Sequence, residues 1–290
     1  MTADNSATAH TLSGLAPRYN MTDKEFGCLR QLICRHTGIF LSEHKRDLVY
    51  NRLVKRVRAC GLSSFQDYCR LIEQVPIDEL EHFTNAITTN LTSFFRESHH
   101  FNYLRDIIVP DYLESRQANG RMRIWSAGCS TGEEPYSIAM TLRDAIYGID
   151  NRDIRILATD LDSQVLGTAE DGIYPLSCIE GIDSSGMRRW FSKGTGARTG
   201  HVRVVDVLRK MVTFRKHNLM DSWPMRGPFD CIFCRNVMIY FDKSTRRTLL
   251  DRFADILKPG GFLFIGHSET LYDLSNRFRP MGKTIYQKIS

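Results

Sequence analysis

The sequence predicts an α/β protein with two parts: a small all-helical N-terminal domain and a Rossmann-like domain. Three observations support this prediction. A strand, helix and second strand follow one another over residues 121–160, four helical patterns precede residue 90, and a further strand, helix and strand lie between residues 229 and 265.

The segment from 121 to 160 is the most informative. An apolar strand at 121–125 is followed by a loop of small residues, a helix that begins at Glu133, a strand at 154–159, and then Asp160. In such βαβ units the glycines, here beginning with Gly128, let a ligand approach the backbone. A carboxylate at the tip of the second strand accepts hydrogen bonds from ribose hydroxyls. The pattern therefore predicts a cofactor that contains a nucleoside.

The residues around this loop favour one cofactor class. Gly128 and Gly132 are four apart, so the three-glycine spacing of dinucleotide-binding proteins is missing. Glu133 and Glu134 open the helix, where they would repel a diphosphate but would suit the sulfonium and ammonium groups of S-adenosylmethionine. The alternative is that both glutamates only complement the helix dipole.

The later segment has a related pattern. A strand at 229–234 precedes a helix capped by Asp242, and the residues 258–261 (Lys-Pro-Gly-Gly) should end that helix before a strand at 262–265. A helix that ends in this way before an apolar strand resembles the late part of class I S-adenosylmethionine-dependent methyltransferases. Within the strand at 229–234, Cys231 and Cys234 should point to opposite faces, so one metal ion could not bind both.

The N-terminal part differs in kind. Residues 1–19 are expected to be mobile, and helices are expected at 21–36, 43–59, 64–74 and 77–87. The second helix carries a basic stripe opposite an apolar one. Like charges without interleaved acids repel one another, so the stripe predicts an acidic partner, although an ordinary solvated face is the alternative. The stripe consists of Lys45, Arg52, Lys55 and Arg56.

Two connecting regions complete the organisation. Residues 88–97 join the domains, and ligands commonly bind where domains meet, so Asn90, Thr92 and Arg96 are candidate ligand contacts. The second region, residues 172–211, should contain a helix at 187–192, a glycine-rich loop and a strand at 201–205.

Composition limits the location and the cofactors. The 290 residues contain no apolar run that resembles a membrane span, and the N-terminus lacks the basic and apolar blocks of a signal peptide, so we expect a cytoplasmic protein. The eight cysteines show no disulfide spacing, and the nine histidines show no arrangement typical of a metal site.

These motifs together resemble the CheR-type chemotaxis receptor methyltransferases. The matching segments are TTNLTSFFRE (88–97), IWSAGCSTGEEPYSIA (124–139), ILATDLD (156–162), FDCIFCRNVMIYF (229–241) and LKPGGFLFIGHSE (257–269). The resemblance implies a helical domain at 20–90 that recognises the substrate and a methyltransferase domain at 91–290. It implies that a small antiparallel β subdomain, at about 172–211, is inserted into this Rossmann-like domain. It also implies transfer of a methyl group from S-adenosylmethionine to glutamate carboxylates on the cytoplasmic helices of chemoreceptors, with S-adenosylhomocysteine as the product. In this family the insert can also bind a receptor's C-terminal tail peptide as an extra strand.

The resemblance also implies roles for individual residues. Asp160 would hold the ribose, Asn218 and Leu219 would flank the adenine, and Arg96 and Tyr240 would orient the incoming carboxylate. The basic stripe on the second helix would contact the receptor. The remaining cofactor contacts would be Asn90, Thr92, Gly128, Glu134, Arg235 and Asn236.

Three other functions are considered. A nucleic-acid methyltransferase would fit the net charge of +6, but the segment after residue 234 lacks the Asn/Asp-Pro-Pro-aromatic sequence associated with base amino-group methylation. A nicotinamide oxidoreductase is disfavoured by the loop and its glutamates. A non-catalytic adaptor that binds S-adenosylmethionine would be distinguished by its lack of turnover.

Overall fold

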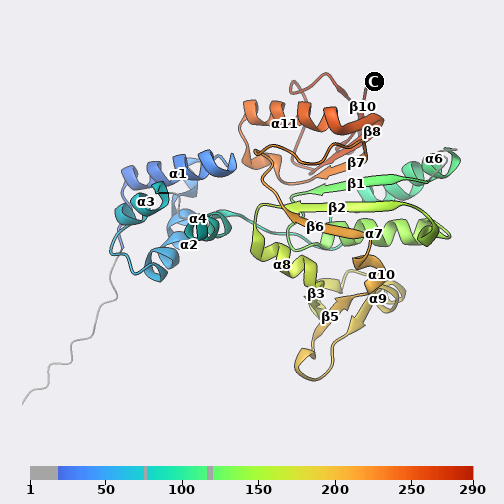
Figure 1. The fold of residues 1–290 in the computed structure, drawn as a ribbon, viewed down its shortest axis with the longest axis horizontal. Coiled ribbons are helices and arrows are strands. Elements are labelled where there is room, and N and C mark those ends of the chain that lie inside the picture. The colour runs from blue at the N-terminus through green and yellow to red at the C-terminus, as the bar shows by residue number, and fades with distance from the viewer. Residues whose placement is uncertain (1–18, 75–76, 116–119, 290) are drawn as a thin grey trace, which may run out of the picture.

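The N-terminal domain is a cluster of four helices. A computed structural model describes residues 19–74, 77–115 and 120–289, and in it this domain lies at one side of a larger α/β domain (Figure 1). Its inward-facing residues, among them Phe26, Leu53, Phe65 and Phe83, are buried. The helices are α1 Asp23–Thr37, α2 Arg46–Ala59, α3 Phe65–Glu73 and α4 Ile77–Ile87.

Local sequence signals account for these helix boundaries. Thr22 and Glu25 form a capping box at the start of α1, and Gly38 ends the helix in the left-handed conformation with φ of 75°. The Ser64 side chain accepts the Asp67 N–H at the start of α3. All four predicted helices are confirmed, with boundaries within a few residues. The predicted mobile segment falls on residues 1–18, which lie outside the described residues, and on Tyr19, whose carbonyl accepts a hydrogen bond from Tyr50.

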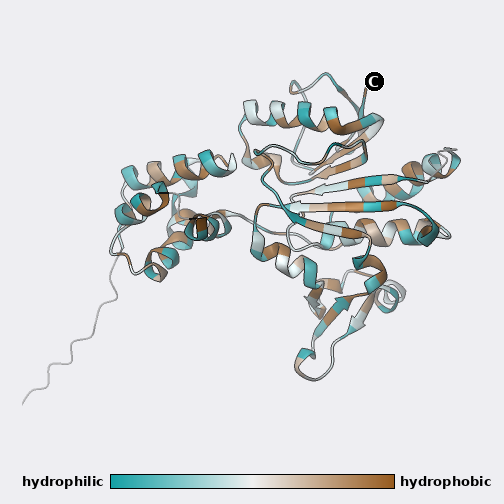
Figure 2. Ribbon diagram, viewed as in Figure 1, coloured by the Kyte–Doolittle hydropathy of each residue, from teal (hydrophilic) through white to brown (hydrophobic). Residues whose placement is uncertain are grey.

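The large domain contains a seven-stranded sheet in the order β6-β2-β1-β7-β8-β10-β9. The first five strands pair in parallel, and β10 pairs antiparallel with both β8 and β9. The central strands carry many apolar residues (Figure 2), as expected when both faces are covered. The strands are β1 Met122–Ala127, β2 Ile154–Asp160, β6 Val212–Lys216, β7 Phe229–Cys234, β8 Leu257–Ile265, β9 Phe278–Gly282 and β10 Ile285–Lys288.

Helices cover both faces of this sheet. One face packs against α7 and the helical segment α5–η2–α6, whereas α11 covers the opposite face, whose core is continuous with that of the N-terminal domain. Cys231 and Cys234 belong to the cores on opposite faces, as predicted. The helices are α5 His99–Tyr103, the π-helical turn η2 Leu104–Ile108, α6 Val109–Glu114, α7 Glu133–Ala145, α8 Ser163–Asp171 and α11 Lys243–Ile256.

The insert is a separate small sheet between α8 and β6, with strand order β3-β5-β4. Its strands are β3 Ile173–Pro175, β4 Phe191–Lys193 and β5 His201–Val204, and its helices are α9 Ser184–Trp190 and α10 Asp206–Arg209. Residues 88–97, the linker between the domains, pack against this small sheet. The Phe94 ring lies edge-on to Tyr174 at 5.1 Å and to Phe191 at 5.3 Å.

Two boundary predictions were wrong. The helix predicted at 187–192 ends at Trp190, because Phe191 pairs with Val204 in the small sheet. The strand predicted at 262–265 begins at Leu257, although its pairing with β7 jumps from Leu257 to Phe262. Residues 258–261 therefore bulge out of the ladder, which accommodates Pro259, a residue without an N–H.

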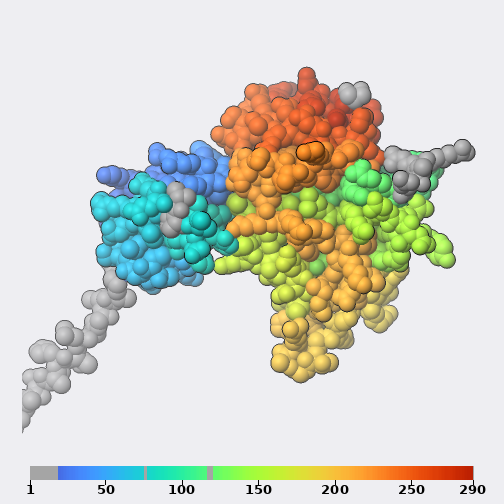
Figure 3. Space-filling view, viewed as in Figure 1, coloured from blue at the N-terminus to red at the C-terminus, as the bar shows by residue number. Residues whose placement is uncertain are grey.

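The sheet order places a crevice above the carboxyl ends of β1 and β7. The chain runs outward from β1 to β2 and β6, and then returns to β7 on the other side of β1. Ligands of open α/β sheets bind at such switch points. The N-terminal domain packs against the large domain on this side (Figure 3).

Candidate functional site

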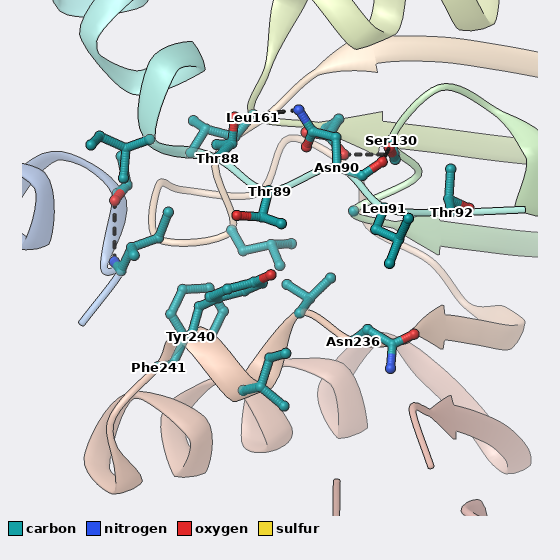
Figure 4. Close-up of a pocket in the computed structure, with 18 of the residues that line it drawn as sticks. Thr88, Thr89, Asn90, Leu91, Thr92, Ser130, Leu161, Asn236, Tyr240 and Phe241 are labelled. Carbon is teal, nitrogen blue, oxygen red and sulfur yellow. Dashed lines mark hydrogen bonds between the residues drawn. The ribbon is translucent and has the colours of Figure 1, made fainter. Parts of the chain in front are cut away.

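A cavity of about 400 Å³ lies above this switch point, within the size range of small-molecule sites. Residues 88–92 of the linker border one side, and Asn236, Tyr240 and Phe241 border the other (Figure 4). Further lining residues come from the loops after β1, β2 and β6 and from the α1–α2 segment. The cavity thus lies between the two domains.

The loop after β1 is shaped by close packing. Gly128 has φ of 83°, and a Cβ atom there would collide with Val237. The backbone N–H groups of Gly128 and Cys129 donate to the Thr159 carbonyl at 2.8 and 2.9 Å. Gly128 thereby lets the loops after β1 and β7 approach each other at the floor of the cavity.

Asp160 lies at the tip of β2 and lines the cavity, as the sequence predicted for its position. Its carboxylate accepts the backbone N–H groups of Ser130 at 2.7 Å and Asp162 at 3.0 Å. Burial raises the pKa of Asp160, and these two hydrogen bonds oppose that shift. Each carboxylate oxygen accepts one of these bonds, so further lone pairs are free to accept ligand hydroxyls.

Glu134 belongs to a buried network of charges. Its carboxylate accepts the Ser126 hydroxyl at 2.7 Å and pairs with the Arg235 guanidinium at 3.1 Å. Arg235 also pairs with Glu97 at 3.4 Å, and its own side chain is 3% exposed. Burial raises the pKa of Glu134, whereas Arg235 lowers it. Both Glu134 and Arg235 line the cavity.

Acids outnumber the cation in the network around Arg235. Two carboxylates, those of Glu97 and Glu134, face its single guanidinium, and Asp160 adds another carboxylate to the lining. When ionised, these groups make this part of the cavity negative, which favours a cation there, whereas Lys45 and Arg96 elsewhere in the lining balance the total charge. The expectation for Glu133 was wrong, because Glu133 is not among the lining residues and its carboxylate accepts the Thr131 hydroxyl.

The linker is held against the large domain by its polar side chains. The Asn90 amide donates to Asp162 at 2.8 Å. The Asn90 carbonyl accepts the Ser130 hydroxyl at 3.0 Å (Figure 4). The Arg96 side chain donates to the Leu91 carbonyl at 2.7 Å, while its own carbonyl accepts from Arg235. The predicted linker residues Asn90, Thr92 and Arg96 all line the cavity.

The turn after β7 carries Tyr240 and is fixed by an acid that sequence reasoning missed. The buried Glu269 carboxylate accepts the backbone N–H groups of Asn236 at 3.0 Å, Ile239 at 3.1 Å and Gly266 at 2.5 Å. Burial raises the pKa of Glu269, and these bonds oppose the shift. An acid shortly after an apolar strand, here Glu269 after residue 265, was the available sequence signal. The backbone N–H groups that this carboxylate accepts cannot be predicted from sequence spacing.

Asn218 and Leu219 also line the cavity, after β6. The Asn218 amide donates to the His36 carbonyl of the N-terminal domain at 2.8 Å, and its oxygen accepts the Met220 N–H at 3.0 Å. Asn218 therefore joins the two domains as well as bordering the cavity. His217, which was not predicted, lines the cavity beside it.

The basic stripe on α2 is less free than its sequence suggested. Arg56 pairs with the Glu79 carboxylate of α4 at 2.5 Å, and Arg52 donates to the carbonyls of Ile87 and Thr88 at 2.5 and 2.8 Å. The premise that no acid relieves these charges was wrong for Arg56. Lys45 and Lys55 remain exposed, and Lys45 lines the cavity.

Comparisons with known proteins agree with this architecture. Residues 24–88 match the family model described as the CheR methyltransferase all-alpha domain, and residues 90–287 match the model of the CheR methyltransferase SAM binding domain. The chain is 46% identical to a chemotaxis protein methyltransferase of Klebsiella aerogenes, over 95% of this chain and 93% of that protein. It is 45% identical to the Salmonella typhimurium protein of the same name, over 97% of this chain and 96% of the relative.

Proposed function

The chain belongs to the CheR methyltransferase family and uses S-adenosylmethionine, and from this premise we propose that it methylates glutamate side chains of chemoreceptors. The proposed product is a glutamate methyl ester on a receptor's cytoplasmic helices. Names of the relatives given above support a role in chemotaxis. None of the helices in the described part of the chain combines the length and apolarity needed to cross a bilayer, and we propose that the protein acts in the cytoplasm.

The lining fits this cofactor chemically. S-adenosylmethionine supplies a methyl group on a positively charged sulfur, and transfer of that group to a carboxylate oxygen leaves the neutral thioether S-adenosylhomocysteine. We propose that Asp160 binds the ribose hydroxyls, and that Glu134, with the excess negative charge around Arg235, favours the cationic part of the cofactor. Asn90, Thr92, Gly128, Asn218, Leu219 and Asn236 would complete the cofactor contacts.

The acceptor needs orientation more than activation. A glutamate with an ordinary pKa of about 4.3 is ionised at neutral pH, so no general base is required. We propose that Tyr240 and Arg96, which both line the cavity, align the incoming carboxylate. Arg96 is tied to the linker through Leu91, which limits the positions that its guanidinium can reach.

Two further partner surfaces belong to this proposal. Lys45 and Lys55 are the exposed members of the α2 stripe and would attract an acidic receptor helix. In the small sheet, β3 and β4 are both edge strands, so either edge offers a site at which a receptor tail peptide can add as a strand. Pull-down of the chain by a receptor tail peptide, with and without deletion of residues 191–204, would test the second surface.

Base-labile methyl transfer tests the proposed activity. The protein would be incubated with tritiated S-adenosylmethionine and receptor-containing membranes, and volatile methanol would be collected after treatment with base. We expect methanol release that depends on the receptor. Cofactor binding without methanol release would favour a non-catalytic adaptor, and label retained on nucleic acid would favour the other methyltransferase class.

A further inference from the structure

Three large apolar side chains are exposed around the mouth of the cavity. Phe40 is 55% exposed, Leu91 is 79% exposed and Ile239 is 50% exposed, and all three line the cavity. They come from the α1–α2 segment, the linker and the turn after β7. We call these three residues the apolar collar. Single exposed apolar residues are common on protein surfaces, but a group around one cavity marks a binding surface.

The collar is exposed although its backbone is fixed. The Phe40 N–H donates to the Tyr240 carbonyl at 2.7 Å, and the Ile239 N–H donates to the Glu269 carboxylate at 3.1 Å. The Leu91 carbonyl accepts from Arg96 at 2.7 Å. The fold therefore holds these side chains in place at the mouth, where they contact water at a cost in free energy. A partner that covers them would recover that cost.

The position of the collar and the charge of Lys45 beside it indicate which kind of partner binds here. The collar forms exposed parts of the cavity lining, and the exposed Lys45 ammonium lines the same cavity and attracts an acidic segment. On a helix, residues three and four positions from a glutamate share its face. When the glutamate enters the cavity, the side chains at those positions contact the apolar collar.

We propose that the apolar collar binds apolar side chains that lie three or four residues from the methylated glutamate on its helix. Lys45 would attract the acidic helix, while the collar would distinguish glutamates with apolar neighbours from those with polar neighbours. This proposal rests on the proposed function, because it takes a helical protein segment as the acceptor.

A double substitution of the collar tests the proposal. In Leu91→Gln/Ile239→Gln we expect the KM for receptor to rise roughly tenfold, the scale of losing partial burial of two apolar side chains. The kcat at saturating receptor and the dissociation constant of S-adenosylmethionine should stay within about twofold of wild type. The matched control is Ile77→Gln, because Ile77 is 83% exposed and lies outside the cavity.

A double-mutant cycle identifies the contact itself. The acceptor would be a soluble receptor cytoplasmic fragment in which the apolar residues three and four positions from one methylated glutamate are replaced by glutamine. If collar and flanking residues touch, the tenfold KM penalty of the collar variant should shrink to about twofold or less on this acceptor. A full tenfold penalty on both acceptors would overturn the proposal.

Other outcomes would also overturn it. Cofactor affinity that falls as much as receptor affinity would mean that the collar covers the cofactor. A defect with membrane-embedded receptor but not with the soluble fragment would mean that the collar contacts lipid. Failure of the wild-type protein to release methanol would instead overturn the proposed function, so the two failures are distinguishable.

Discussion

At the residue scale, the site depends on one buried cation that joins several walls of the cavity. Arg235, after β7, pairs with Glu134 at the start of α7 and with Glu97 at the end of the linker. It also donates to the Arg96 carbonyl. Its guanidinium also lies over the Phe101 ring at 5.5 Å. Removing one partner of a buried ion pair leaves the other charge uncompensated. Arg235 therefore fixes the geometry of the cavity whether or not it touches the cofactor.

Substitutions of the two proposed orienting residues should separate chemistry from folding. In Tyr240→Phe and Arg96→Ala we expect kcat to fall about 10- to 100-fold, because small misalignments of reacting groups have effects of this size. The free energy of unfolding should change by less than about 1 kcal/mol in Tyr240→Phe. Single-turnover methylation and denaturant unfolding would measure the two quantities. Wild-type turnover in both variants would remove these residues from the mechanism.

The missed acid Glu269 should act by positioning the Tyr240 turn. Glutamine at this position offers one carbonyl oxygen, and its NH₂ group would face backbone donors, so hydrogen bonds in the turn are lost. We expect Glu269→Gln to lower kcat roughly tenfold or more, with a smaller change in cofactor affinity. The control is Glu180→Gln on the exposed surface. Equal kcat values in the two variants would contradict the positioning role.

His100 should make the fold sensitive to acid. Burial and nearby Arg235 lower the pKa of His100 to about 3, from 6.5 for an exposed histidine. The unfolded chain therefore binds more protons between these values, and stability falls as the pH drops below 6.5, at up to about 1.4 kcal/mol per pH unit. In His100→Gln this slope should be smaller between pH 6.5 and 5, with a remainder from His36 and His217, whose pKa values burial also lowers. Unfolding by urea at several pH values would measure it, and an unchanged slope would exclude His100.

Residues could be predicted from the sequence where local chain geometry places them. Asp160 follows directly from its place at a strand tip, and Gly128 follows from the loop before the helix. Glu97 and Glu269 were missed because their partners come from distant segments, and a sequence does not reveal which backbone N–H groups a carboxylate will meet. For Glu133 and Glu134, adjacent positions on the helix have different environments, and only packing decides between them.

At the element scale, α2 should contribute to receptor binding through Lys55 and through Lys45 at its N-cap. Lys45→Glu/Lys55→Glu should lower methylation efficiency at low salt and flatten its salt dependence, because exposed charges act on encounter and are screened beyond about 8 Å at physiological salt. Stability should be preserved, and cofactor affinity should be preserved in Lys55→Glu alone, because Lys55 lies outside the cavity that Lys45 lines. Methylation rates measured against ionic strength would show this. An unchanged rate at low salt would mean that the stripe is only a solvated face.

Arg56 provides a contrast on the same helix. Because its guanidinium pairs with Glu79, whose carboxylate also accepts the Tyr68 hydroxyl at 2.7 Å, a glutamate here would place two carboxylates together. Any loss of methylation in Arg56→Glu would therefore include a loss of folding stability. The helical periodicity predicted which residues share a face. It could not predict that α4 would supply an acid to one of them.

At the scale of the whole molecule, the cavity exists because two domains meet. The order of elements predicted both domains, since each has its own periodicity. Their relative placement was not predictable, because it depends on polar contacts between distant residues. Lys216 pairs with Glu81 at 2.6 Å, Thr88 donates to Asp162 at 2.7 Å, and Phe40 donates to Tyr240. These contacts join the N-terminal domain and the start of the linker to the end of β6 and to the loops after β2 and β7.

A cavity built from both domains should couple their stabilities through the cofactor. A ligand at one hundred times its dissociation constant stabilises the state that binds it by about 2.7 kcal/mol. Trp125, Trp190 and Trp223 all lie in the large domain, so tryptophan fluorescence follows that domain, whereas circular dichroism also includes the N-terminal helices. We expect S-adenosylhomocysteine to raise both transition temperatures together. A smaller shift of both in Asp160→Ala, at the same ligand concentration, would tie the effect to this cavity. If only the fluorescence transition moved, the N-terminal domain would border the cavity without contributing to binding.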